Sequence, residues 1–71
     1  MTDQVVIYVT PPSTDRGPWR VRSDHRPVDE RPTEAEAIRL AVTYVQMIEH
    51  AGGIALVKVE RPDGTWEAFH A

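Results

Sequence analysis

The chain has 71 residues, a formal net charge of −3 and no cysteine. This length predicts a single small domain over residues 1–71, with the polar residues 1–4 frayed at its start. The absence of cysteine excludes disulfides and the common structural zinc sites. No segment resembles a membrane span or a signal peptide, so we expect a cytoplasmic protein without a membrane partner. A core this small supplies only about 3–5 kcal/mol of net folding stability. Self-association could therefore add to the stability of the domain.

Residues 5–9 form a run of β-branched and aromatic side chains, which predicts a buried central strand. Residues 10–18 contain three prolines and a glycine and are expected to form a loop. Residues 19–22 then alternate, with Trp19 and Val21 on one face and Arg20 and Arg22 on the other. This pattern predicts a half-exposed strand that forms a hairpin with the first strand.

Residues 23–32 contain many charges and two prolines but little apolar content beyond Val28. We therefore expect a loop in this segment. Its length exceeds the usual connection of roughly 4–6 residues, and long loops often carry function.

A helix is predicted over residues 34–51. Thr33 and Glu36 have the spacing of a capping box, Pro32 favours a sharp start, and Gly52 suits the left-handed position after the last turn. The apolar arc of this helix spans roughly 220°, although one supporting layer needs little more than 100°. Its excess lies along one rim, at Leu40, Tyr44 and Met47, which is the candidate protein interface.

Residues 54–60 and 65–70 are predicted to form a second hairpin around a Pro-Asp-Gly turn, in one of two registers. A two-residue turn places Val59 opposite Ala68 and buries Trp66 on the core side. A three-residue turn places Trp66 opposite Glu60, on the same side as Lys58. We favour the first register because it buries the tryptophan; a tryptophan exposed beside Lys58 would instead indicate a recognition surface.

The predicted fold class is therefore α+β, in the order β-β-α-β-β. Two antiparallel hairpins form a sheet that packs on one face against the helix. The sequence leaves the order of the strands in the sheet open.

Several short patterns resemble the small bacterial domain of unknown function 2188 across residues 7–69. They are Tyr8-Val9 followed by Pro11, a glycine before Trp19-Arg20-Val21, the segment Thr33-Glu34-Ala35-Glu36-Ala37-Ile38, Gly53 before an apolar strand, and the Asp63-Gly64 turn. The resemblance implies two hairpins around one helix. It implies no catalytic residue and no established activity.

The residues that carry chemistry are sparse. His25, His50 and His70 lack the spacing of metal ligands, and neighbours such as Ser23-Asp24-His25 seldom build a catalytic triad. No phosphate-binding loop or nucleophile motif is present in the sequence. We expect a protein that is not an enzyme and that has no metal, cofactor or small-molecule substrate.

Two functional hypotheses remain. The first is an interaction module that self-associates or binds a protein partner through the helix rim or a sheet edge. The second is a nucleic-acid-binding accessory protein, because residues 16–31 carry five arginines against three acids. Its candidate contacts are Arg16, Trp19, Arg20, Arg22 and Arg26. The negative net charge of the whole chain favours the first hypothesis.

Overall fold

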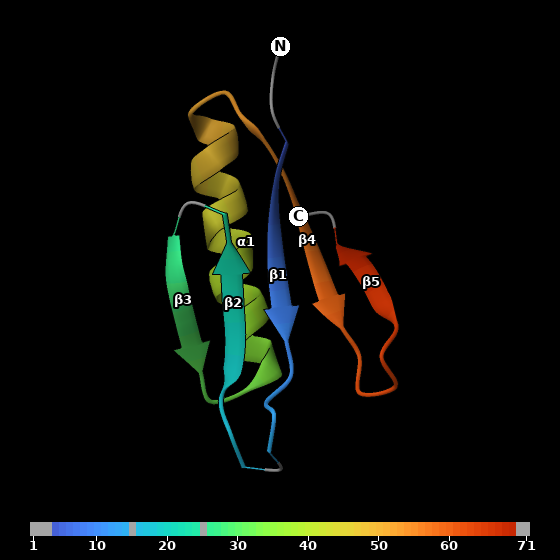
Figure 1. Cartoon of the computed structure of the whole chain (residues 1–71). Coiled ribbons are helices and arrows are strands. Elements are labelled where there is room, and N and C mark those ends of the chain that lie inside the picture. Colours follow the sequence, from blue (N-terminus) through green and yellow to red (C-terminus); the bar gives the residue numbers. More distant parts are fainter. Residues whose placement is uncertain (1–3, 15, 25, 70–71) are drawn as a thin grey trace.

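The computed structural model describes residues 4–14, 16–24 and 26–69 and shows five strands and one helix (Figure 1). The elements are β1 (Gln4–Thr10), β2 (Trp19–Ser23), β3 (Arg26–Arg31), α1 (Glu34–His50), β4 (Ile54–Glu60) and β5 (Trp66–Phe69). All strands belong to one sheet in the order β3-β2-β1-β4-β5, and the helix lies against one face of it. The predicted α+β class is confirmed. The predicted fraying concerns residues 1–3, which lie outside the described residues, and Gln4, which begins β1.

The predicted loop over residues 23–32 is wrong, because most of it forms the edge strand β3. This strand is antiparallel to β2, with Trp19 opposite Arg31 and Arg20 opposite Glu30. An edge strand has a neighbour on one side only, so it tolerates the charges and the proline (Pro27) that suggested a loop. The element order is therefore β-β-β-α-β-β.

The strand β1 lies at the centre of the sheet, as predicted. It is antiparallel to β2 and parallel to β4, which the chain reaches by crossing over through α1. Its two faces differ: Ile7 and Val9 are fully buried under the helix, whereas Val6 and Tyr8 are only partly buried on the other side. The expected burial on both faces is thus corrected to burial on one face.

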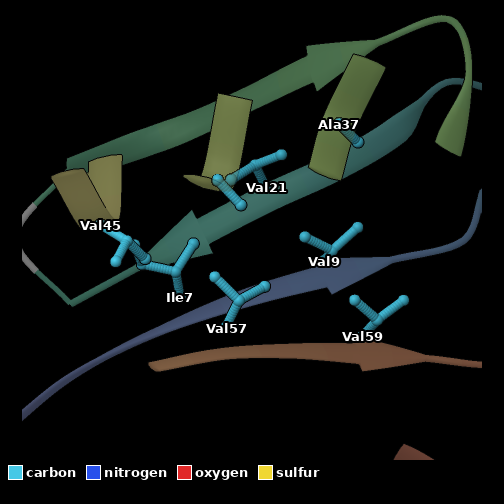
Figure 2. Packing of buried hydrophobic residues seen from close by; sticks show 8 residues of the cluster. Ile7, Val9, Val21, Ala37, Val45, Val57 and Val59 are labelled. Carbon is cyan, nitrogen blue, oxygen red and sulfur yellow. The ribbon is translucent and has the colours of Figure 1, made fainter. Parts of the chain in front are cut away.

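The core lies between α1 and the sheet (Figure 2). The sheet contributes branched side chains and the helix contributes a stripe of small ones, which lets the two layers approach closely. The buried residues are Ile7, Val9, Val21, Val57 and Val59 from the strands and Ala37, Ala41 and Val45 from the helix.

The ends of α1 follow the sequence signals. The hydroxyl of Thr33 accepts a hydrogen bond from the Glu36 amide at 3.2 Å. At the other end Gly52 has φ of 91°, and the Gly53 amide donates to the Ile48 carbonyl at 2.8 Å, as in a Schellman motif. Among the described residues, no helix is long and apolar enough to cross a membrane.

We predict that Ile7→Val lowers the free energy of unfolding by about 0.5–1.5 kcal/mol, because it removes one methylene from a fully packed site. Urea denaturation followed by circular dichroism measures this change. The matched control is Val28→Thr, at a β3 side chain that is 52% exposed, with an expected change within about 0.5 kcal/mol. An equal loss of unfolding free energy in the two variants would contradict the placement of Ile7 in the core and of Val28 at the surface.

Candidate recognition surface on the open sheet face

The side of the sheet that faces away from α1 is here called the open face. Its residues follow from the strand register, since residues directly opposite each other point to the same side. Tyr8 on β1 lies opposite Arg22 on β2 and Lys58 on β4, and Lys58 lies opposite Ala68 on β5. These four residues form a row across four strands.

A second row crosses the open face next to the first. Arg20 lies between Thr10 on β1 and Glu30 on β3, and Glu60 on β4 lies opposite Trp66 on β5. The two rows place Trp66 and both strand arginines on one surface.

Trp66 is the most prominent side chain of this surface, with 49% of it exposed. Its ring meets the Tyr8 ring edge to face, with centroids 5.7 Å apart and planes at 78°. The two rings, Lys58 and Ala68 line a hollow of about 470 Å³. Two aromatic walls and one ammonium group therefore surround the same space.

The exposure of Trp66 results from the register of the second hairpin, for which the favoured prediction is wrong. Gly64 donates to the Arg61 carbonyl at 2.9 Å, and the Arg61 amide donates to the Thr65 carbonyl at 2.8 Å, so the turn has three residues. A two-residue Asp-Gly turn needs positive φ at both positions, whereas only Gly64 has it, with φ of 88°. Asp63 instead accepts hydrogen bonds from the amide and the hydroxyl of Thr65. These bonds lower the pKa of the Asp63 carboxyl.

Arg61 connects this turn to the start of the helix. Its guanidinium donates to the Glu67 carboxylate on β5 at 2.9 Å and to the Glu34 carboxylate on α1 at 3.3 Å. The hydrogen bond to Glu67 is the main reason that the pKa of Arg61 is raised. Arg61 therefore holds β5 in place beside the helix layer and leaves Trp66 on the opposite side.

Charge is distributed unequally between the two faces. Along the paired strands the open face carries three cations, Arg20, Arg22 and Lys58, and two carboxylates, Glu30 and Glu60. A third carboxylate, Asp24, lines a hollow with Tyr8 and Arg22 at the end of β2. Arg20 lies 3.7 Å from Glu30, and within the described ranges neither Arg22 nor Lys58 forms an ion pair. On the other layer, α1 carries three glutamates and one arginine, and Arg26 and Arg61 lie against it. The open face therefore balances its cations and carboxylates, whereas the helix itself is acidic.

The structure separates the five candidate nucleic-acid contacts. Arg20 and Arg22 lie on the open face, as their alternation predicts. Trp19 packs against the core on the helix side, and the Arg26 guanidinium lies 4.6 Å from the centre of the Tyr44 ring on α1. Arg16 is exposed in the loop between β1 and β2. Only two of the five can therefore act together with the aromatic pair.

The candidate protein interface on the helix rim is also divided. Leu40 and Tyr44 are partly buried against the core, and the Tyr44 hydroxyl donates to the Asp29 carboxylate on β3. Met47 is 51% exposed and borders a shallow depression together with Thr43, Gln46 and His50. Much of the apolar excess predicted for this rim thus packs within the domain.

Tyr8 and Ala68 are absent from the predicted sites, and Trp66 and Lys58 are considered only as the pair that the other register of the second hairpin would expose. Their signal was present as alternation, because Tyr8 lies between the core residues Ile7 and Val9 and Lys58 lies between Val57 and Val59. The all-apolar appearance of residues 5–9 hid this alternation.

The histidines do not form a site in the described part of the chain. His50 is exposed in the last turn of α1, while His25 and His70 lie outside the described residues. The described residues contain no group of three or more metal-ligating side chains.

We predict that Tyr44 loses its hydroxyl proton at a higher pH than an ordinary tyrosine. The hydrogen bond to Asp29, with some burial, raises the pKa of the Tyr44 hydroxyl in the folded protein. The stability from this raised pKa is fully present below the unfolded value of about 10 and is lost as pH rises through the folded value. An ultraviolet titration should lose its late component in Tyr44→Phe and keep it in the control Tyr8→Phe. Persistence of the late component in Tyr44→Phe would contradict the assignment.

Comparison of the chain with protein-family models, with characterised proteins and with solved structures found no match. The resemblance to the domain of unknown function 2188 therefore stays a prediction. The chemistry of the open face is the remaining guide to function.

Proposed function

We propose that the protein is a non-enzymatic nucleic-acid-binding module and that the open face is its binding surface. The observation that carries this proposal is the half-exposed Trp66, which packs edge to face on Tyr8 beside Lys58. Arg20 and Arg22 lie on the same face. Aromatic rings and cations together match the two parts of a nucleic acid, its bases and its phosphates.

The apolar part of the open face supports a binding role. Val6 and Leu56 lie opposite each other beside Tyr8 and Lys58, and both are only partly buried. Apolar side chains that gather on one uncovered surface often mark a binding site. Tryptophan and tyrosine supply large contact areas and lose little conformational entropy when they bind.

The exposed cations support a polyanion rather than a basic or neutral surface as the ligand. Three cations, Arg20, Arg22 and Lys58, share the open face with the aromatic pair, and the acidic helix lies on the far side of the sheet. Arginine forks bind phosphate oxygens in pairs, and the lysine adds a point charge. The net charge of −3 opposes long-range attraction, so we expect modest affinity that depends strongly on salt.

The alternative of a protein interface on the helix rim or at a sheet edge has weaker support. On the rim, Leu40 and Tyr44 pack against the core. At one edge, β3 carries Pro27 and several charged residues, which disfavour pairing with a further strand. On the open face, by contrast, the large aromatic side chain of Trp66 stays half exposed.

The test is the fluorescence anisotropy of labelled single-stranded and duplex oligonucleotides at several salt concentrations. Three phosphate contacts predict a slope of log K against log salt of about −2 for single strands and about −3 for duplex. The double variant Arg20→Ala/Arg22→Ala should lose about one unit of slope per arginine. Arg39→Ala, at an exposed arginine of α1, is the matched control and should leave the slope unchanged.

Absence of binding at low salt would overturn the proposal. So would an equal effect of the control and the double variant, because the cations of the open face would then have no special role.

A further inference from the structure

We infer that the nucleic acid on the open face is single-stranded and that one unpaired base stacks on Trp66 in the hollow that Tyr8, Lys58 and Ala68 complete. This inference rests on the proposed function and specifies its ligand. It follows from the shape of the hollow, the width of the sheet and the positions of the cations.

The hollow suits a flat aromatic ligand. The Tyr8 and Trp66 rings stand at 78° to each other, so one forms a wall and the other a platform. Ala68 is small and leaves the space next to the indole open. A nucleobase can stack on such a platform only when it is unpaired and turned out of a helix.

The open face is too wide to enter duplex DNA. Five neighbouring strands span four gaps of about 4.8 Å, or about 19 Å in total. The major groove of B-DNA is about 12 Å wide and admits a helix or a two-stranded ribbon. A sheet of this width can instead support a single strand that lies across it.

The cations define a path for the backbone of that strand. Lys58 borders the hollow on β4, and Arg22 lies in the same row two strands away, at about 10 Å. Arg20 lies on the same strand as Arg22, on the same side of the sheet. A single strand with its base at Trp66 therefore passes Lys58 and then Arg22 in the first row and Arg20 in the second, so its phosphates can meet these three cations.

The experiment compares a short labelled single strand with a hairpin duplex of the same composition at low salt. It uses the full chain with Trp19→Phe, because Trp19 packs on the helix side and Trp66 then remains as the only indole. We expect tighter binding of the single strand and quenching of the Trp66 fluorescence by it. Trp66→Ala should weaken single-strand binding by roughly 5- to 150-fold, the range for loss of one stacked base. Trp66→Phe keeps an aromatic ring and should retain most of the binding; circular dichroism verifies that each variant is folded.

The other outcomes separate the inference from the proposed function. Equal or tighter binding of the duplex, or single-strand binding that Trp66→Ala leaves unchanged, would overturn the inference while the nucleic-acid function stands. Binding of neither oligonucleotide would overturn both. A Trp66 fluorescence change that depends on protein concentration alone, together with a dimer in light scattering, would show that a second copy covers the face and would also overturn both.

Discussion

A five-stranded sheet has two faces, and the described chain supplies a single helix to cover them. The helix packs on the side of Ile7, Val9, Val21, Val57 and Val59 and buries them completely. The side chains between these residues along each strand must point the other way. The same alternation that builds the core therefore places Tyr8, Arg20, Arg22 and Lys58 on the open face, where the arginines are exposed and Tyr8 and Lys58 are partly buried.

The second hairpin decides what this open face carries. Its three-residue turn places Trp66 opposite Glu60, whereas a two-residue turn would have placed it on the core side. Gly64 adopts the positive φ that the turn requires, and the Asp63 carboxylate accepts a hydrogen bond from the Thr65 amide. These two local features stabilise the register that leaves the Trp66 ring half exposed. Arg61 then ties β5 to the first turn of the helix. A large apolar ring that stays half exposed to water is typical of a binding surface.

The helix, its caps, the first hairpin and the α+β class could be predicted from the sequence, because each has a strong local signal. Thr33, Gly52 and the alternation from Trp19 to Arg22 are examples. The edge strand β3 could not, since its pairing with β2 depends on a neighbour that local propensity does not report. The candidate site was found in part. Arg20 and Arg22 follow from alternation, and the first hairpin places Arg22 beside Tyr8. The proximity of this group to Lys58 and Trp66, however, depends on the parallel pairing of β1 with β4. That pairing joins residues about fifty positions apart and leaves no mark on either segment alone.

The position of Trp66 in solution most directly tests whether the open face carries an aromatic platform. Nuclear Overhauser contacts measured on the isotopically labelled protein report which side chains the indole touches. We expect contacts between the Trp66 indole and the Tyr8 ring, with Lys58 paired to Ala68 across β4 and β5. Contacts from the indole to Val57 and Val59 would contradict this expectation, because they would place Trp66 in the core and leave the open face without its aromatic platform.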